Sequence, residues 1–343
     1  RSPAPACFTD ACTNVREPNY SLSPPFSFSM STSPIVHIAL CADAKYLSYS
    51  AAAAASALLA TTDSKVCVHL ISADLRPAAI GRYRGFVEQM GGLFTYHQLS
   101  KAQANAFHVT SDATRLSCAA YYRIFIPELV EADIDRILYI DGDVSVTQSL
   151  TQLNTIPLGD NAVAATEDLN RDTNKRCARL GYPAADGYFN SGVLVFNLKI
   201  WRKENLVQRC VEYFRAHHHH IIYDDQDLLN AVLHGRVHWL PIVWNAQDLF
   251  YRTKCSKVCR PLTEDEILQL KNPVIVHFCG PLKPWHWRGM HPFRREFFKA
   301  VAKTPWGNRT LRRKVSYSSK HYVKLALTYI RLTKKRYQNW NTK

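Results

Sequence analysis

Two aspartates separated by one glycine are the strongest candidate for chemistry in this sequence. Asp141-Gly142-Asp143 directly follows the apolar run 137–140, which predicts a buried strand. Residues i and i+2 of an extended chain point to the same side, so both carboxylates should leave the strand end together, with no side chain on Gly142 between them. Two carboxylates this close repel each other unless a divalent cation lies between them and a polyanion. The triplet by itself fits a metal site and an ordinary acidic turn equally well.

A histidine far along the chain favours the metal site. His277 ends the last apolar run and is followed by a turn that contains Gly280, Lys283 and Trp285. An imidazole at a strand end can join oxygen ligands around a borderline metal such as manganese. Gly280 permits close approach of the backbone, and Lys283 offers a point charge suited to phosphate. A single histidine in a strand is commonly a core residue, but this combination indicates a site for a metal and a phosphate.

Two further polar clusters lie between these motifs. Asp224-Asp225-Gln226-Asp227 opens the helical run 228–233. Acids at a helix N-terminus are stabilised by the helix dipole, so one of them is expected to cap the helix. Three carboxylates and an amide exceed what capping requires, and they predict a polar site. Asn190-Ser191-Gly192 precedes the apolar run 193–197 and predicts a loop at a strand start, for which an ordinary turn is an alternative.

Alternating apolar runs and helical stretches must position these residues. Strands are expected at 35–40, 66–71, 93–97, 137–140, 163–166, 193–197, 237–240 and 274–278, and helices at 46–62, 77–90 and 118–130. The strands are continuously apolar, which predicts an α/β fold with a mostly parallel, Rossmann-like sheet covered by helices on both faces. Ligands bind such sheets at the carboxyl ends of the strands. Neither a G-x-G-x-x-G after the first strand nor a phosphate-binding G-x-x-x-x-G-K-[ST] is present, which disfavours a dehydrogenase or a P-loop NTPase.

The positive charge of the chain is concentrated at its C-terminus. The net charge is +15, yet residues 297–343 contain 13 Lys and Arg and no Asp or Glu, and the other residues carry 30 basic and 28 acidic side chains. Within 320–336, apolar and aromatic residues recur at helical spacing. A basic helix with such a face predicts binding to an anionic membrane surface. A terminal helix packed on the body is the alternative, and nucleic acid is not expected as a partner.

The N-terminal residues and the cysteines indicate the cellular compartment in which the protein is expected. Residues 1–29 are rich in Ser and Pro and lack a signal-peptide pattern, so they are expected to be a disordered or non-native extension before a natural start at Met30. The alanine-rich stretch 46–62 is too short and too weakly apolar to span a membrane. Ten cysteines without disulfide-scaffold spacing indicate a reducing compartment. Together with the basic tail, these features predict a cytoplasmic protein at the inner face of the cell membrane.

The ordered set of motifs resembles glycosyltransferase family 8, and within it the bacterial lipopolysaccharide galactosyl- and glucosyltransferases. The likeness covers residues 35–287 and comprises Ala-Asp-x-x-Tyr from Ala42, Tyr-Tyr-Arg-Ile, Asp-x-Asp, Phe-Asn-Ser-Gly, Asp-Gln-Asp and His-x-x-Gly-x-x-Lys-Pro-Trp. It implies a retaining enzyme of the GT-A fold. Together with the basic tail and the N-terminal extension described above, the expected organisation is an extension at 1–29, a catalytic domain at 30–296 and a membrane-associating tail at 297–343. Such an enzyme transfers galactose or glucose from a UDP-sugar to a saccharide or glycolipid acceptor.

The resemblance also implies roles for individual residues. Asp141, Asp143 and His277 would bind Mn²⁺, with Mg²⁺ as an alternative. Gln226 and Asp225 would lie at the reaction centre, and Asp168 and Cys279 would contact the acceptor. The donor would be bound by Cys41, Asp43, Lys45, Tyr46, Arg123, Asp141, Gly142, Asn190, Gly280 and Lys283. Two positions depart from the family pattern: Lys45, where Asn is common, and Arg115, where some relatives carry a donor-contacting His.

The mechanism of retention has two candidates. Loss of UDP leaves an oxocarbenium-like sugar, and an amide such as that of Gln226 is a poor nucleophile. We therefore expect a same-face substitution in which the acceptor attacks as UDP leaves, with a double displacement through Asp225 as the rival. Two other functions stay open: a related UDP-glucosyltransferase that acts on another polysaccharide, and a non-catalytic protein that binds membranes or nucleic acid. A non-catalytic protein would leave the polar motifs unexplained.

Overall fold

The computed structural model describes residues 35–107, 118–170, 172–252, 258–286 and 289–307, together with residues 323, 326, 327 and 337. All of them belong to one unit, Ser33–Lys343. The expectations for residues 1–29 and for Arg115 lie outside the described residues, as does most of the predicted tail helix at 320–336.

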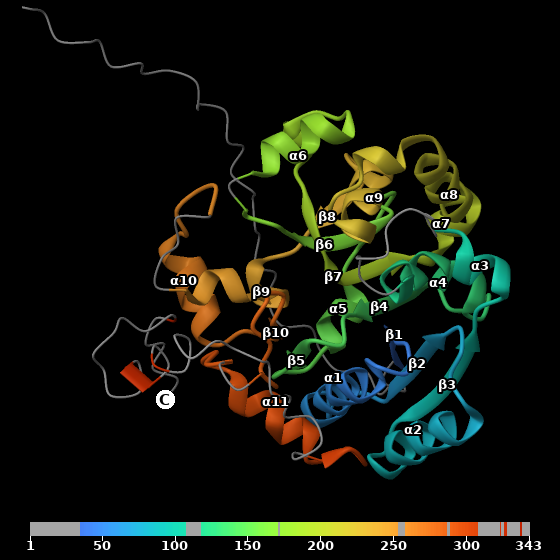
Figure 1. Cartoon of the computed structure of the whole chain (residues 1–343), viewed down its shortest axis with the longest axis vertical. Coiled ribbons are helices and arrows are strands. Elements are labelled where there is room, and N and C mark those ends of the chain that lie inside the picture. Colours follow the sequence, from blue (N-terminus) through green and yellow to red (C-terminus); the bar gives the residue numbers. More distant parts are fainter. Residues whose placement is uncertain are drawn as a thin grey trace, which may run out of the picture. The chain divides into compact units, whose positions relative to one another are not determined.

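A seven-stranded sheet carries the fold, and a three-stranded sheet lies beside it (Figure 1). The large sheet has the order β3-β2-β1-β4-β7-β6-β8, and the small sheet the order β5-β10-β9. Each predicted run forms a strand of one of these sheets. The large sheet comprises β1 (Val36–Cys41), β2 (Val66–Ser72), β3 (Leu93–Gln98), β4 (Arg136–Ile140), β6 (Val163–Glu167), β7 (Phe189–Asn197) and β8 (Val237–Trp239); the small sheet comprises β5 (Val144–Val146), β9 (Ala246–Gln247) and β10 (Ile275–His277).

Strand direction confirms the mostly parallel sheet. The pairs β1–β2, β2–β3, β1–β4 and β6–β8 are parallel, whereas β7 runs antiparallel to β4 and to β6. The direction of β7 determines which residues lie beside Asp141. Because Ile140 is in register with Val193, the residues just before Val193 lie opposite the chain that leaves β4.

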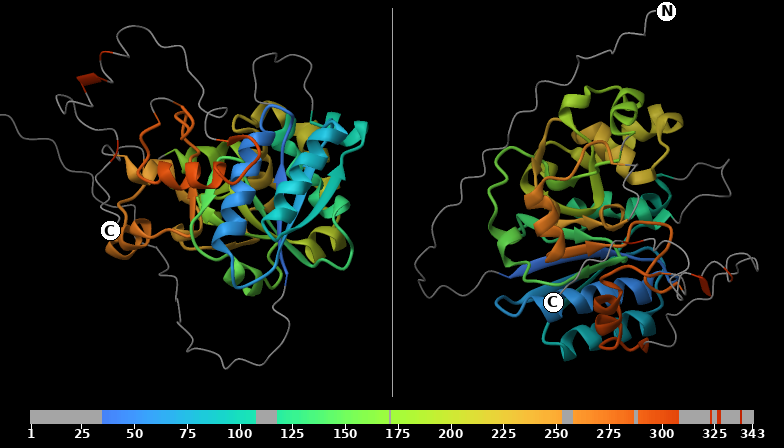
Figure 2. Two further views of the ribbon diagram at one scale, coloured as in Figure 1. Left: turned by 90° about the horizontal axis from the view of Figure 1, so that it is seen from below. Right: turned by 90° about the vertical axis from the view of Figure 1, so that its left-hand side faces the viewer.

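Helices cover both faces of the large sheet, as expected for strands that are apolar on both sides (Figure 2). Side chains of α1 and α2 pack on one face, and those of α4, α7, α8 and α9 on the other. The helices are α1 (Leu47–Ala60), α2 (Pro77–Gln89), α3 (Lys101–Asn105), α4 (Ile126–Leu129), α5 (Thr151–Thr155), α6 (Thr173–Leu180), α7 (Leu198–Lys203), α8 (Leu206–His217), α9 (Asp224–Leu233), α10 (Glu264–Lys271) and α11 (Arg294–Val301), with short 3-10 helices η1 (Cys118–Phe125), η2 (Ala184–Asp186), η3 (His218–His220), η4 (Ile242–Trp244) and η5 (Asp248–Tyr251).

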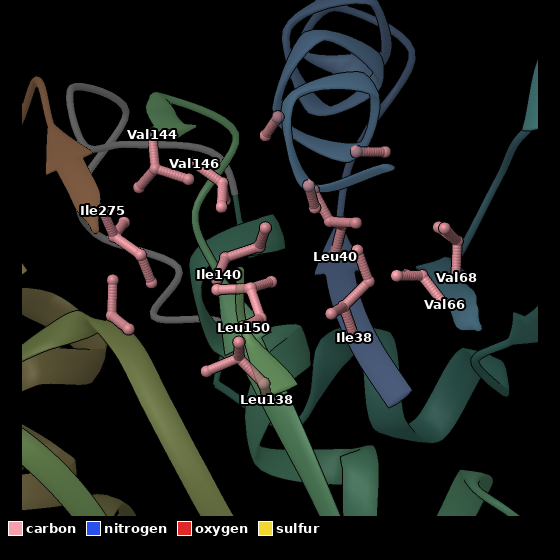
Figure 3. Close-up of a cluster of buried hydrophobic side chains, with 14 of the residues drawn as sticks. Ile38, Leu40, Val66, Val68, Leu138, Ile140, Val144, Val146, Leu150 and Ile275 are labelled. Atoms are coloured by element: carbon pink, nitrogen blue, oxygen red, sulfur yellow. The ribbon is translucent and has the colours of Figure 1, made fainter. Parts of the chain in front are cut away.

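The alanines of α1 allow this helix to lie very close to the sheet. Residues 51–55 are all alanine and all buried. Beneath the helix, Ile38 and Leu40 of β1 meet Leu138 and Ile140 of β4, and the core continues into β5 and β10 (Figure 3). A Cβ on Gly142 would lie 3.2 Å from the backbone nitrogen of Ser50 in α1. Gly142 therefore permits the close packing of α1 against the loop between β4 and β5.

Two local predictions are wrong. The stretch 118–130 is not one α-helix but η1 followed by the single turn α4, because Pro127, which lacks a backbone N–H and suits a helix start, begins a new helix there. Asn190, Ser191 and Gly192 do not form a loop but lie inside the fully buried strand β7. Hydrogen bonds from distant residues satisfy their polar groups, and these contacts are invisible in the sequence.

The C-terminal part of the body extends beyond the boundary expected at residue 296. Helix α11 crosses it, and Phe297 is completely buried in a cluster with Tyr49 and Trp285. Further along, Tyr337 is also buried, and its hydroxyl donates a hydrogen bond of 2.6 Å to Asp248. Within the described residues, no helix is both long and apolar enough to cross a membrane.

Candidate active site

A cavity of about 650 Å³ opens at the carboxyl ends of β1 and β4. This is the sheet edge at which the sequence places Asp141. The cavity brings together fourteen of the residues expected to function: Cys41, Tyr46, Arg123, Asp141, Gly142, Asp143, Asp168, Asn190, Asp225, Gln226, His277, Cys279, Gly280 and Lys283. Cys41 and Lys283, the most distant of them, are 242 positions apart in the chain.

Two residues expected to bind the donor do not line this cavity. Oδ1 of Asp43 accepts hydrogen bonds from the backbone N–H groups of Lys45 (2.9 Å) and Tyr46 (2.8 Å). Asp43 thereby shapes the turn that begins α1 and carries Tyr46 to the cavity. The Lys45 side chain is exposed.

Asp141, Asp143 and His277 converge on one point. Nε2 of His277 lies 3.4 Å from Oδ1 of Asp143 and 3.7 Å from Oδ2 of Asp141, and all three ligand atoms lie within 4.8 Å of one another. The register of the small sheet explains this convergence, because His277 on β10 pairs with Val144, the residue after Asp143. Two carboxylates and one imidazole form a donor set suited to a divalent cation such as Mn²⁺.

A buried asparagine orients the imidazole. Nδ1 of His277 lies 3.0 Å from Oδ1 of Asn245, and the amide nitrogen of Asn245 donates to Oδ1 of Asn190 at 2.9 Å. An N–H on Nδ1 leaves the lone pair of Nε2 directed at the two carboxylates, as in most metal-binding histidines. Asn245 is fully buried and was not predicted from the sequence, where nothing distinguishes it from an ordinary polar residue.

Gly192 provides the space in which a cation could lie. A Cβ at this position would lie 2.7 Å from Oδ2 of Asp141 and closer still to the ring of His277. Any side chain here would therefore fill the space between the imidazole and the carboxylate. The sequence had indicated only a turn at Gly192.

Lysine and histidine keep Asp143 ionised. Nζ of Lys283 lies 2.5 Å from Oδ2 of Asp143 and donates to the carbonyl of Phe278 at 2.9 Å. Burial alone would raise the pKa of Asp143, but Lys283 and His277 outweigh it and hold this pKa well below its usual range. Beside them, a Cβ on Gly280 would collide with Asp248 and Arg252, so the close approach of these segments requires glycine.

Arg123 connects Asp141 to Asp225. Its guanidinium is buried and lies 2.9 Å from Oδ1 of Asp141 and 3.1 Å from Oδ2 of Asp225. The hydroxyl of Tyr139 also donates to Asp141, at 2.6 Å. Burial raises the pKa of Asp225 to about 6 although Arg123 acts in the opposite direction.

Hydrogen bonds at both ends fix the amide of Gln226. Its Oε1 accepts from the amide of Asn190 (3.1 Å) and the backbone of Ser191 (3.3 Å), while its Nε2 donates to Asp168 (2.9 Å). Arg176 donates to the same oxygen of Asp168 at 3.1 Å. A continuous polar network thus leads from His277 through Gln226 to Asp168.

The four consecutive polar residues at the start of α9 divide into two groups. Asp225 and Gln226 line the cavity, as does Asp224, whose φ of 47° is a strained left-handed conformation for a residue other than glycine. Asp227 instead is fully buried and accepts hydrogen bonds from the backbone N–H groups of Ile222 and Tyr223. Asp227 is therefore the structural acid that the sequence led us to expect among them.

With this geometry in place, comparison with known proteins identifies the family. A model of glycosyl transferase family 8 matches residues 37–289. The chain belongs to this family. The family and fold expected from the motifs are therefore confirmed, and the protein is a glycosyltransferase with sugar donor and acceptor substrates.

Similar proteins include enzymes of lipopolysaccharide synthesis. General stress protein A of Bacillus subtilis is 30% identical over 79% of this chain and 95% of its own length. Lipopolysaccharide 1,3-galactosyltransferase of Salmonella typhimurium is 27% identical over 78% and 79% of the two chains. Lipopolysaccharide 1,2-glucosyltransferase of Escherichia coli is 25% identical over 81% of each.

Two solved structures of the galactosyltransferase LgtC have the same fold. One is a complex with donor and acceptor sugar analogues, with a TM-score of 0.68 and 25% identity over 84% of this chain and all of that chain. The other is an active-site mutant, with a TM-score of 0.71 and 27% identity over 80% of this chain and all of that chain.

Replacing Gly192 with alanine should weaken Mn²⁺ binding at least about tenfold, because the new methyl group would displace His277 from the carboxylates. Isothermal titration calorimetry with MnCl₂ measures this. Gly85→Ala in α2 is the matched control, since a Cβ there meets no atom within 4 Å. Equal affinity of Gly192→Ala and the wild type would show that the cation does not use this space.

Asp225 should make stability depend on pH. Its pKa of about 6 lies above the ordinary 3.8, so its stabilising contribution is fully present below pH 3.8 and is lost as the pH rises through 6. Relative to Asp225→Asn, the free energy of unfolding of the wild type should fall by about 2 kcal/mol from about pH 4 to about pH 7. Urea denaturation across this range measures the difference. Parallel pH profiles for the two proteins would contradict the raised pKa.

Proposed function

We propose that this glycosyltransferase transfers galactose or glucose from a UDP-sugar to a saccharide acceptor with retention of anomeric configuration. One observation carries the proposal: two carboxylates and an imidazole converge in a cavity that also contains Lys283 and Gly280. A sugar nucleotide carries a diphosphate, and this diphosphate requires positive charge in a cavity that contains several carboxylates.

The donor set fits a divalent cation, Mn²⁺ with Mg²⁺ as an alternative, held by Asp141, Asp143 and His277. Two features support the fit: Gly192 keeps the space between the ligands open, and Asn245 orients the imidazole. When bound, the cation would neutralise the diphosphate and stabilise the leaving UDP. Lys283 already lies against Asp143 and would contribute a second positive charge beside the phosphates.

The remaining cavity residues provide a pocket for the donor. Cys41 and Tyr46 lie at the carboxyl end of β1 and the start of α1, where the nucleoside would bind. Arg123 and Asn190 would contact the sugar, which places the anomeric carbon between the metal cluster and Gln226. Asp43 would act by holding the turn that presents Tyr46, since its own carboxylate caps that turn.

The environment of Asp225 supports same-face substitution over double displacement. Its carboxylate is buried and paired with Arg123, so its negative charge is partly neutralised. Gln226 is held rigidly by hydrogen bonds to Asn190 and Asp168, and its amide dipole can face a developing oxocarbenium ion without forming a bond. The acceptor hydroxyl would attack from the side on which UDP leaves.

The acceptor would be a saccharide of the lipopolysaccharide core or a related glycolipid, by analogy with the two lipopolysaccharide transferases. Asp168 lies at the far end of the polar network from the metal cluster, and Cys279 is exposed at the cavity. Both would contact the acceptor. Arg176, which bonds to Asp168 and lies with its guanidinium over Tyr223, adds a cation and an aromatic surface there.

The basic segment after residue 307 would hold the enzyme at the cytoplasmic face of the membrane, close to a glycolipid acceptor. Eleven basic and no acidic residues between 308 and 343 support this proposal. Val323, one of the few described residues of the segment, is helical and 59% exposed, as expected of an apolar face without a protein partner.

In an assay with UDP-galactose and UDP-glucose, the wild type should release UDP in the presence of Mn²⁺, and Asp143→Asn should lower kcat at least about 100-fold, because charge stabilisation of the leaving group is lost. Asp74→Asn, an exposed carboxylate outside the cavity, should leave kcat unchanged. Proton NMR of the product should show the α-configuration of the donor. Inactivity with both sugars, full activity of Asp143→Asn or an inverted product would each contradict the proposal.

Removal of residues 308–343 should abolish co-sedimentation with vesicles that contain anionic lipid. Each basic residue near such a surface contributes about 1 kcal/mol, so several acting together suffice for binding. Vesicles of phosphatidylcholine alone are the control and should not bind either protein. Unchanged sedimentation of the truncated protein with anionic vesicles would exclude the tail as the membrane anchor, without affecting the assignment of the active site.

A further inference from the structure

Three histidines lie side by side across the large sheet, away from the active site. They are His37 on β1, His69 on β2 and His97 on β3. Nδ1 of His37 lies 2.9 Å from Nε2 of His69, and Nδ1 of His69 lies 2.8 Å from Nε2 of His97. None of the three lines the active-site cavity, and none has a part in the transfer reaction described above.

A carboxylate completes this group. Glu131, which follows α4, places Oε2 at 3.9 Å from Nδ1 of His69. Ligand atoms of Glu131, His69 and His97 all lie within 4.8 Å of one another. The imidazoles are buried, with 1% of His69 and 8% of His97 exposed, whereas the Glu131 side chain is 49% exposed. A cation could therefore enter from solvent beside Glu131 and reach both imidazoles.

The neighbours of the two histidines can supply the hydrogen-bond partners that metal ligands need. A metal-binding imidazole commonly donates its second ring N–H to a nearby acceptor. For His97 this acceptor is the backbone of Leu129, and for His69 it is Nδ1 of His37. With those two protons in place, Nδ1 of His69 and Nε2 of His97 both present lone pairs to the same point, beside the carboxylate of Glu131.

We propose that His69, His97 and Glu131 bind one zinc ion, with water as a fourth ligand and His37 as the partner that orients His69. Two imidazoles and a carboxylate form a common donor set for zinc. Zinc–nitrogen bonds of about 2.05 Å at a tetrahedral angle separate two nitrogens by about 3.3 Å, so the rings need to move apart by only about half an ångström.

Glu131 brings a carboxylate to the two imidazoles and offsets part of the charge of the ion.

A second candidate set of metal ligands also includes His69. His37, Cys67 and His69 also have ligand atoms within 4.8 Å of one another. In that set a metal would be bound by the sulfur of Cys67 as well as by two imidazoles. The set with Glu131 contains no sulfur ligand, so the two can be told apart by experiment.

The proposed ion would stabilise the fold and would take no part in sugar transfer. It would tie the segment between α4 and β4 to β2 and β3. His37 precedes Cys41, which lines the active-site cavity, by four residues, or about 13 Å along β1. Zinc at this site is therefore independent of a cation between Asp141 and Asp143, and the proposal does not rest on the donor or acceptor of the enzyme.

The test uses a background in which two other candidate zinc sites are removed, the four consecutive histidines and the cluster of Asp141, Asp143 and His277. His217, His218, His219 and His220 are replaced with asparagine, because consecutive imidazoles at the end of α8 bind transition metals, and Asp143→Asn disables the catalytic cluster. In this full-length background, we expect one zinc ion per chain by elemental analysis after dialysis, and a melting temperature that rises with zinc. Cobalt should give the visible bands of tetrahedral coordination without a thiolate charge-transfer band.

Three variants decide between the outcomes. Glu131→Gln removes an exposed ligand and should weaken zinc binding at least about tenfold, whereas Asp133→Asn, an exposed carboxylate two residues further on, should not. Cys67→Ser should bind zinc like its parent. No zinc bound in the background, or equal affinity after Glu131→Gln, would overturn the proposal and leave the histidines as a hydrogen-bonded row. A thiolate band together with loss of binding in Cys67→Ser would overturn it in favour of the other donor set.

Discussion

The structure depends on how the charges of Asp141 and Asp143 are compensated. Two carboxylates separated by one residue after a strand repel each other, and burial makes the repulsion more costly. Each therefore has its own partners. Arg123 and Tyr139 bond to Asp141, whereas Lys283 and His277 lie against Asp143. These partners come from η1, β4 and the segment around β10, so the two sheets have to meet at this point.

The direction of β7 determines whether a cation has space beside these carboxylates. Because β7 runs antiparallel to β4, the backbone N–H of Asp141 donates to the carbonyl of Gly192 at 2.9 Å. Gly192 is thus fixed opposite Asp141 and beside His277, where a side chain would fill the site. The one antiparallel strand of the large sheet, β7, therefore leaves open the space in which a cation could lie.

Buried amides link His277 to Gln226 on the opposite side of the cavity. Asn245 connects His277 to Asn190, and Asn190 bonds in turn to Gln226. Buried polar groups that lack partners are destabilising, so each member of such a network restricts the orientation of the next. Gln226 consequently has one defined amide orientation before any substrate binds. The side chain of Gln226 is thereby held in a fixed position on the wall of the cavity.

From the sequence alone, eight of the ten strands in the described residues could be predicted, as could the mostly parallel sheet and the polar motifs that meet at its carboxyl edge; the short strands β5 and β9 could not. These features depend on local hydrophobic patterns and on the order of motifs, both of which a single chain displays. Only the tertiary structure showed that Asn190 to Gly192 lie inside a buried strand, that Asn245 orients His277, and that Asp43 and Lys45 stay outside the cavity. The first two depend on contacts between residues far apart in the chain, which a pattern of neighbouring residue types does not contain. The third depends on local hydrogen bonds of Asp43 to the turn before α1, whose geometry the sequence does not display. The sequence thus predicted which side chains form the candidate site, and the packing of β7, β9 and β10 decided its geometry.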